Sequence, residues 1–219
     1  MAFELPRNHP CRNPNANVFE ILGWFLTEFT ILENVLKILL IRSIKSDLQA
    51  GYFLVARLDA KALPSKIRAA LKQTRRISED LKALLLDIER VANIRNELCH
   101  CAPSFDDKYS KIQCHGFGVT LAGGDVPSKT YSANQLRHLA YYAGAAALDI
   151  LNATDCLLLG QTASTASLAK AAFPHSPPIA GQFDQGIPHT LAQKPVEEAL
   201  ARREQKAREL AEYQRTHGS

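Results

Sequence analysis

Apolar residues recur along most of the chain at the spacing of α-helices. The longest such stretch covers residues 17–44, where apolar side chains three or four positions apart fall on one helical face. Asn17 precedes it as an N-cap, and Glu20 stands three residues later, as in a capping box. Because the apolar stripe is wide, we expect a long central helix. The stripe consists of Ile21, Phe25, Ile31, Leu32, Val35, Leu36 and Leu39.

Further helices are predicted on both sides of the chain's midpoint. After a break at 46–51, the apolar segment 52–58 fits either a short helix or a loop laid over the core. The same spacing predicts helices over 64–75, from Ser78 to about Pro103, and over 132–159. The last of these is rich in alanine, which allows a close approach between helices.

The predicted helix ends carry residues that suit them. Ser78 can cap a helix, and Glu79 and Asp80 lie in its first turn, where the helix dipole favours negative charge. Pro103 ends that helix because proline cannot continue the hydrogen-bond ladder. Gly160 ends the helix that Ser132 begins.

Between the last two helices the pattern changes. Residues 112–114 and 119–121 suggest two short strands, with a turn at 123–125. We therefore predict an all-α domain with a small β-hairpin or an ordered loop inserted near 109–131.

Composition divides the chain into four parts. Residues 1–16 form a polar N-terminal extension without the order of a signal peptide. The helical domain covers 17–160. Residues 161–193 have the Ala, Ser, Thr, Pro and Gly content of a flexible linker. Residues 194–219 form a charged helix that is either solvated or docks on a partner.

Charge and cysteine content narrow the class of protein only a little. The 219 residues include 26 Lys and Arg against 22 Asp and Glu, a net charge of +4 that tolerates a nucleic-acid partner without demanding one. The 5 cysteines are irregularly spaced, which fits reduced thiols in a cytosol. Charged residues interrupt the longest apolar run, so we expect no membrane span and a cytoplasmic protein.

One short stretch, residues 94–101, combines residues suited to chemistry. Asn96 and His100 are four positions apart and share one helical face. Arg95 points about 100° away from Asn96, but its side chain is long enough to swing back. The C-terminal end of a helix also favours a protonated imidazole.

Histidine and arginine at one site suit RNA cleavage. The reaction needs a base for the ribose 2′-hydroxyl, an acid for the leaving oxygen, and positive charge near the pentavalent phosphorane. Histidine titrates near neutral pH and arginine stays charged. Such a pair can act without a metal ion, with the RNA's own hydroxyl as nucleophile.

The stretch resembles the R-x(4–6)-H signature of HEPN domains. Arg95, four residues and His100 match the spacing, and Asn96 is the polar residue that commonly follows the arginine. The opening helix, with Trp24, Phe25, Glu28, Leu32 and Glu33, also looks like that of bacterial HEPN proteins. The resemblance covers 17–160. One subgroup has a tyrosine two residues after the histidine, where this chain has Ala102.

The resemblance implies an antiparallel helical bundle that forms a homodimer, with two motifs facing one cleft. It implies a metal-independent endoribonuclease that needs no cofactor, of the kind found in toxin–antitoxin and phage-defence systems. RNA is then the substrate, and an antitoxin or other protein could dock on the C-terminal helix. Other HEPN domains have lost catalysis and only bind RNA, nucleotide or protein.

The residues have expected roles under this hypothesis. His100 acts as general base or acid, Arg95 stabilises the phosphorane charge, and Asn96 orients the substrate or the histidine. Candidate substrate-binding residues are Glu33, Asn93 and Glu97. The expected product carries a 2′,3′-cyclic phosphate.

Simpler interpretations stay open. Arg95 and His100 could only cap helix carbonyls. Glu28 and Glu33 could orient the motif or merely face solvent, and a solvated helix face explains Asn93 and Glu97 equally well. The residues Cys99, His100, Cys101, Cys114 and His115 could be assembled into a zinc site. Their spacing lacks the usual ligand pairs, so buried free thiols fit better.

Overall fold

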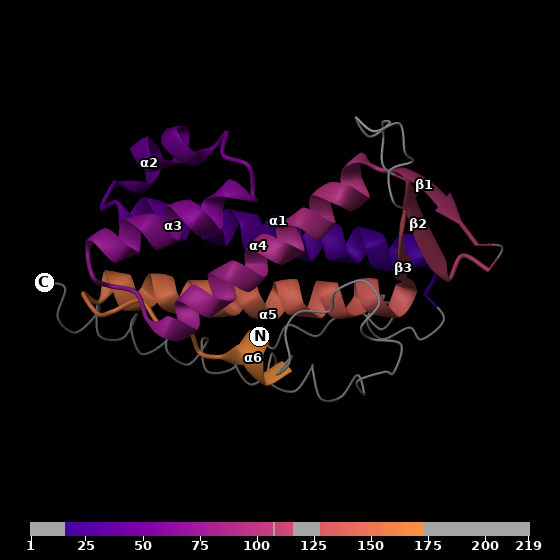
Figure 1. Cartoon of the computed structure of the whole chain (residues 1–219). Helices are drawn as coiled ribbons and strands as arrows, with labels where there is room; N and C mark the ends of the chain where they lie inside the picture. Colours follow the sequence, from indigo (N-terminus) through magenta and orange to yellow (C-terminus); the bar gives the residue numbers. More distant parts are fainter. Residues whose placement is uncertain (1–15, 107, 116–127, 173–219) are drawn as a thin grey trace, which may run out of the picture.

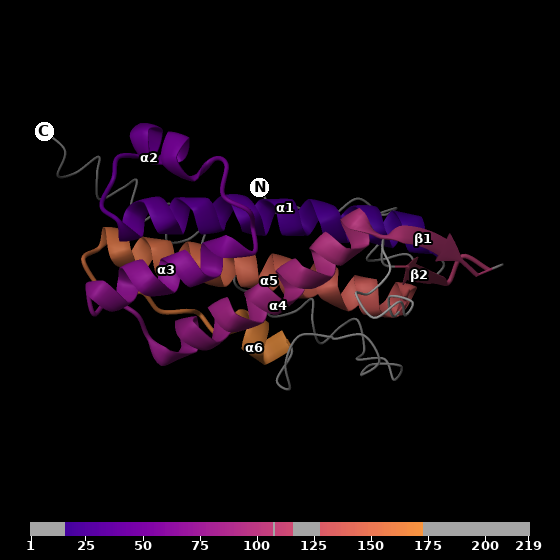
Figure 2. The same cartoon turned by 45° about the horizontal axis from the view of Figure 1, so that its top comes forward.

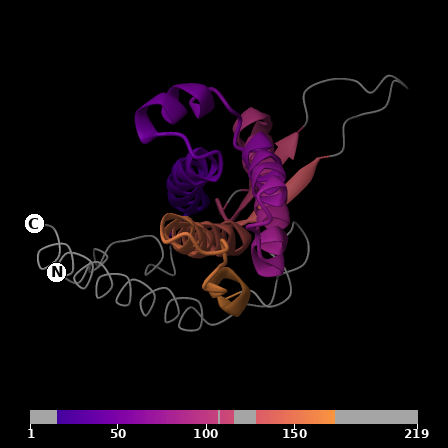
Figure 3. The same ribbon diagram turned by 90° about the vertical axis from the view of Figure 1, so that its left-hand side faces the viewer.

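Two long helices form the centre of the molecule. The computed structural model describes residues 16–106, 108–115 and 128–172. Helices α1 (Val18–Ser43) and α5 (Ala133–Leu158) lie side by side along their length (Figure 1). Seen nearly end-on, α3 (Ala62–Gln73) and α4 (Glu79–His100) run along one flank of this pair (Figure 3).

The three predicted N-caps are confirmed. Asn17 Oδ1 accepts hydrogen bonds from Phe19 N and Glu20 N, each at 3.0 Å, and Glu20 Oε2 accepts one from Asn17 N at 3.0 Å. Ser78 Oγ accepts from Leu81 N at 3.2 Å at the start of α4. Ser132 Oγ accepts from Gln135 N at 3.2 Å at the start of α5. Local chemistry therefore sets where these helices begin.

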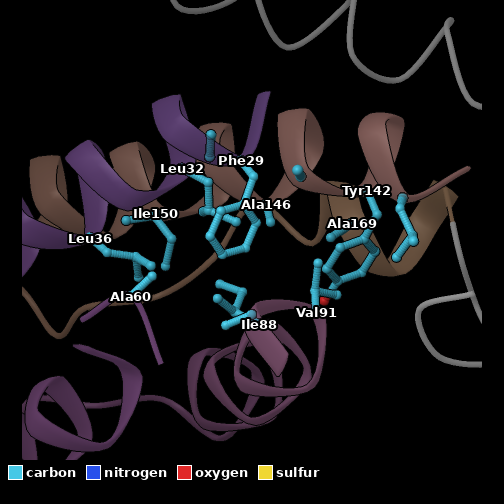
Figure 4. Packing of buried hydrophobic residues seen from close by; sticks show 14 of the residues in the cluster. Phe29, Leu32, Leu36, Ala60, Ile88, Val91, Tyr142, Ala146, Ile150 and Ala169 are labelled. Carbon is cyan, nitrogen blue, oxygen red and sulfur yellow. The ribbon is translucent and has the colours of Figure 1, made fainter. Parts of the chain in front are cut away.

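The core lies where α1, α4 and α5 meet. Phe29 and Leu32 of α1 are buried against the alanine-rich face of α5, which contributes Ala146 (Figure 4). Ile88 and Val91 of α4 approach the same cluster. Small side chains on α5 let α1 come close, so large residues of α1 and α4 fill the remaining volume.

The inserted segment is larger than the single hairpin that the sequence predicts. Strands β1 (Ala102–Phe105), β2 (Lys111–His115) and β3 (Lys129–Ser132) form an antiparallel sheet in the order β1-β2-β3. The predicted strand 112–114 lies within β2, whereas 119–121 lies outside the described residues. The domain is therefore mainly helical with a three-stranded sheet, rather than all-α with one hairpin.

The three-stranded sheet and the short helix that follows α1 lie at opposite ends of the bundle. The strands lie beyond the end of α4, and α2 (Leu48–Val55) lies at the far end over α1 (Figures 1 and 2). Of the two alternatives for 52–58, the short helix is the one observed. It begins earlier than expected, so Gly51 of the predicted break lies inside it.

Residues after α5 continue to pack on the bundle. Ala163 is fully buried and forms a parallel bridge with Ile77. Asp149 of α5 accepts hydrogen bonds from Leu168 N at 3.1 Å and Ala169 N at 2.9 Å at the start of α6 (Leu168–Ala172). The first part of the predicted linker 161–193 thus contacts the domain.

The other predicted segments fall mostly outside the described residues. These are 1–15, the rest of the linker, and the charged helix 194–219. Within the described part of the chain, no helix has the length and apolar character needed to cross a membrane.

Two glycines provide a test of how α2 packs on α1. A Cβ at Gly51 would clash with Cγ1 and Cγ2 of Ile41 and would lie 3.2 Å from its Cβ, an atom that rotation of the Ile41 side chain does not move. We expect Gly51→Ala to lower the free energy of unfolding by about 1–3 kcal/mol, as overpacking does. Urea unfolding followed by circular dichroism measures the change.

Gly23 of α1 is the matched control. A Cβ there meets nothing within 4 Å, so Gly23→Ala should raise the free energy of unfolding by about 0.5–1 kcal/mol. A stabilising effect of Gly51→Ala would show that α2 does not pack on Ile41 in this way.

Candidate functional site

The motif lies in the last turns of α4, which two apolar residues fix against the core. Ile94 and Leu98 are each 8% exposed. Arg95, Asn96 and Glu97 are half-buried between these anchors, and Asn93, Cys99 and His100 are exposed. The helix ends as predicted before Pro103, with Cys101 N donating to Glu97 O at 2.9 Å.

Arg95 is held by contacts to two helices. Its guanidinium carbon lies 5.9 Å from the ring centroid of Phe29 on α1, a cation–π arrangement. Its Nη1 donates to Asn96 Oδ1 at 3.1 Å. The structure thus brings the predicted Arg95 and Asn96 together, and it fixes the arginine before any ligand arrives.

His100 is placed differently. It is the last residue of α4 and is exposed to solvent, with no hydrogen-bond partner for its imidazole among the described residues. Five positions separate it from Arg95, about 140° around the helix and 7.5 Å along it. Within the part of the chain that the structure describes, side-chain contacts therefore hold Arg95, whereas the imidazole of His100 forms no hydrogen bond.

The three predicted substrate-binding residues have separate surroundings. Glu97 Oε2 accepts from Lys129 Nζ at 2.8 Å and from the Tyr131 hydroxyl at 3.1 Å, which ties α4 to β3. Glu33 pairs with Lys37 at 2.7 Å on α1. Asn93 is exposed. The structure gives Glu97 and Glu33 structural contacts and leaves Asn93 open to solvent.

Glu28 lies between α1 and α5 rather than beside the motif. Trp24 Nε1 donates to its Oε1 at 3.1 Å, and Oε2 lies 3.2 Å from where a Cβ of Gly144 would be. Burial raises the pKa of Glu28, and the bond from Trp24 opposes the rise only in part. None of its described hydrogen bonds reaches Arg95 or His100.

The cysteines near the motif do not form a described metal site. Burial raises the pKa of Cys114 to about 12, and its hydrogen bond with the Cys101 thiol adds to the effect. Such a thiol stays protonated and unreactive at neutral pH. Among the residues that the structure describes, no three His, Cys, Asp or Glu side chains gather as metal ligands would.

A polar pocket lies near the other end of α4. It has a volume of about 170 Å³, and its lining includes Asp80 and Asp87 of α4, Tyr142 and Asp149 of α5, and Lys170 of α6. Burial raises the pKa of both Asp87 and Asp149, and Arg90 opposes the shift at Asp87. Burial also raises the pKa of Tyr142 well above its ordinary value, and the two carboxylates add to this. Sequence reasoning missed this pocket because its residues come from three distant segments.

Comparison of the chain with protein-family models, curated proteins and solved structures finds no match. The functional assignment therefore rests on the residues and geometry of this chain.

The two partners of Glu97 should differ in their contribution to stability. Tyr131 is 1% exposed, so its hydroxyl bond to Glu97 is shielded from solvent on the tyrosine side, and Tyr131→Phe removes this bond. We expect a loss of about 1–2 kcal/mol in the free energy of unfolding. The Lys129 side chain is 55% exposed, and Lys129→Ala should cost less than about 1 kcal/mol. Equal losses in urea unfolding would contradict this ranking.

Glu28 predicts a pH dependence. Because its pKa is raised in the folded state, its contribution to stability is present at low pH and is lost as pH rises through that value. Glu28→Gln keeps an acceptor for Trp24 without a charge. The variant should therefore be more stable than wild type at pH 8 and should lose this advantage as the pH falls toward about 4.

Urea unfolding at several pH values measures the difference. Glu33→Gln on the same helix is the control, because it removes an ion pair with Lys37, which is 8% exposed. It should lower stability at pH 8. A Glu28→Gln variant that is less stable than wild type at pH 8 would rule out a desolvated carboxylate.

Proposed function

We propose that this protein is a metal-independent endoribonuclease with a HEPN-like fold, in which Arg95 and His100 at the end of α4 act on RNA. The observation that carries the proposal is the placement of Arg95. Its guanidinium carbon lies 5.9 Å from the centroid of the Phe29 ring, its Nη1 donates to Asn96, and an exposed histidine follows about one and a half turns later. A cation that stays charged and a solvent-accessible imidazole at the same helix end are the two kinds of group that cleavage by the RNA's own hydroxyl needs.

In the proposed reaction, His100 accepts the proton of the ribose 2′-hydroxyl. The 2′-oxygen attacks the adjacent phosphorus, and the bond from phosphorus to the 5′-oxygen breaks. Arg95 stabilises the charge on the phosphorane, and the leaving 5′-oxygen takes a proton from an acid. The products are a 2′,3′-cyclic phosphate and a 5′-hydroxyl, and no water or metal ion is consumed.

A second copy of the chain completes this scheme. One histidine cannot be base and acid at the same moment, whereas two copies facing one cleft supply both. The resemblance to HEPN domains leads us to propose such a homodimer.

Binding without cleavage is the second candidate function. One observation favours it: His100 has no described partner that would orient its imidazole, and general bases are usually held by a third group. In that case the motif binds RNA, a nucleotide or a protein, and the protein is not an enzyme.

Cleavage of a labelled RNA pool in EDTA tests the proposal. Wild type should cut, and His100→Ala should cut about 10²- to 10⁴-fold more slowly because it lacks the general acid or base. Arg95→Ala should be impaired by a similar factor. The ends of the fragments should be 2′,3′-cyclic phosphates.

Two variants serve as matched controls. His115 is an exposed histidine on β2 that bonds to Ser104, and Arg90 is a half-exposed arginine on α4 that pairs with Asp87. His115→Ala and Arg90→Ala should cut at the wild-type rate. Cleavage that survives both motif substitutions would come from a contaminant, and a wild type that binds RNA without cutting it would favour the binding function.

A further inference from the structure

Helix α2 leaves most of its apolar side chains uncovered. Gly51 lies against Ile41 of α1 and Val55 is buried, so this side of the helix packs on the bundle. The other large apolar side chains of α2 are exposed, as is the apolar residue in the turn before it. These residues, called the α2 surface below, are Ile44, Leu48, Tyr52, Phe53 and Leu54.

The α2 surface points away from the core. Successive residues of a helix are 100° apart, so Phe53 lies about 180° from the midpoint between Gly51 and Val55. Phe53 is 78% exposed and Leu54 is 68% exposed, the two highest values among the large apolar side chains that the structure describes. The fold does not need these side chains, and a partner that took them out of water would gain from their burial.

Positive charge is concentrated around α2. Residues 42–76, which include the end of α1, all of α2 and all of α3, contain nine Lys and Arg against two Asp. The rest of the chain contains 17 Lys and Arg against 20 Asp and Glu. The small net charge of the whole chain thus conceals one strongly basic segment.

Most cations of this segment are available to a ligand. The two aspartates accept backbone bonds close to them in the chain, Asp47 from Ala50 N at 2.9 Å and Asp59 from Lys61 N at 3.3 Å. Six of the nine cations are exposed and form no ion pair among the described residues. They are Lys45, Arg57, Lys61, Lys66, Lys72 and Arg75.

Carboxylates of the neighbouring helices do not cancel this charge. Helix α5 lies across α1 from α2, so its acidic residues are on the other side of the bundle (Figure 3). The described carboxylates of α1 and α4 toward this end of the bundle have cations of their own. The pairs are Glu33 with Lys37, Glu79 with Lys82, Asp80 with Lys170, Asp87 with Arg90, and Glu89 with Arg68.

Apolar side chains bordered by cations match the surface of an anionic bilayer. Leucine and phenylalanine side chains enter the boundary between headgroups and acyl chains, and Lys and Arg are attracted to the anionic headgroups. Helix α2 has eight residues, whereas a helix that crosses a bilayer needs about 20. It can therefore lie in the plane of the interface but cannot span it.

Other occupants fit the α2 surface less well. An RNA strand would pair with the cations but would leave the aliphatic side chains of Leu48 and Leu54 against a polar ligand. A second copy of the same face would bring equal positive charges together. The segment 194–219 has six Lys and Arg against five Glu, so it lacks the acidic excess that would complement this face.

We propose that the α2 surface binds membranes that contain anionic phospholipid, with Phe53 and Leu54 at the headgroup boundary and the surrounding Lys and Arg facing the headgroups. Helix α2 and the sheet lie at opposite ends of the bundle (Figure 1). A protein bound in this way keeps the end of α4, with Arg95 and His100, away from the bilayer. The inference does not depend on cleavage of RNA.

Co-sedimentation of the full chain with vesicles tests the site. One set of vesicles is phosphatidylcholine alone, and the other contains about 30% phosphatidylserine, which gives the surface a negative potential. Wild type should bind the anionic vesicles, and its partition coefficient should be about 10-fold or more lower on the neutral ones because several cations contribute.

Phe53→Gln tests the apolar contact. The partition coefficient on anionic vesicles should fall about 10- to 100-fold, as expected when one phenylalanine side chain is no longer buried. The urea unfolding midpoint should not fall, because Phe53 points away from the core. Leu86 of α4 is 49% exposed and stands beside Asp87, so Leu86→Gln is the matched control and should bind as wild type does.

Lys61→Gln tests the charge and keeps the inference testable even if Phe53→Gln is unstable. It should weaken binding to anionic vesicles about 5-fold and leave binding to neutral vesicles unchanged. Lys111 is an exposed lysine of β2, at the other end of the bundle. Lys111→Gln should therefore bind both kinds of vesicle as wild type does.

Several outcomes would overturn the membrane site. They are no binding to anionic vesicles, equal binding to both kinds of vesicle, and equal losses in a variant and its control. Binding of single-stranded RNA that Phe53→Gln weakens, without binding to vesicles, would assign the α2 surface to RNA. A dimer that Phe53→Gln dissociates, again without binding to vesicles, would assign it to a second copy.

The test is also separate from that of the proposed ribonuclease. Cleavage of RNA by a wild type that binds no vesicles would overturn the membrane site alone. Binding to anionic vesicles that depends on Phe53, by a protein that never cuts RNA, would support the membrane site and refute the nuclease.

Discussion

Close packing of α1 against α5 is the constraint on which the other contacts depend. The small residues along α5 bring α1 near, and Gly144 leaves room for the Glu28 carboxylate between the two helices. Burial between the helices raises the pKa of Glu28. Helix α5 covers only one side of the large α1 side chains such as Phe29. Helix α4 packs against their other side and completes the core.

The candidate site follows from this arrangement. Phe29 belongs to the core and also provides the ring with which Arg95 makes its cation–π contact. Leu98 of α4 is buried in the core. The helix ends two residues later at His100, which is exposed to solvent. Glu97 then joins α4 to Tyr131 of β3. The motif is thus supported on one side by α1 and on the other by the sheet, while the imidazole of His100 has no hydrogen-bond partner among the described residues.

Sequence reasoning succeeded where the determining contacts are local. Asn17, Ser78 and Ser132 cap helices through bonds to residues two or three positions away, so their roles can be predicted without a fold. The hydrogen bond between Glu97 and Tyr131 joins residues 34 positions apart, and no pattern along the chain predicts it. The pocket lined by Asp87 and Asp149 escaped prediction for the same reason, because it needs distant segments to meet.

The difference between the fixed arginine and the free histidine has a mechanistic consequence. A general base acts from a defined position, and a surface imidazole gains one only from a neighbour. The described residues of this chain supply such support to Arg95, through Phe29 and Asn96, but not to His100. In the reaction that we propose, a second copy of the chain or the RNA itself would have to supply this support where the described residues do not.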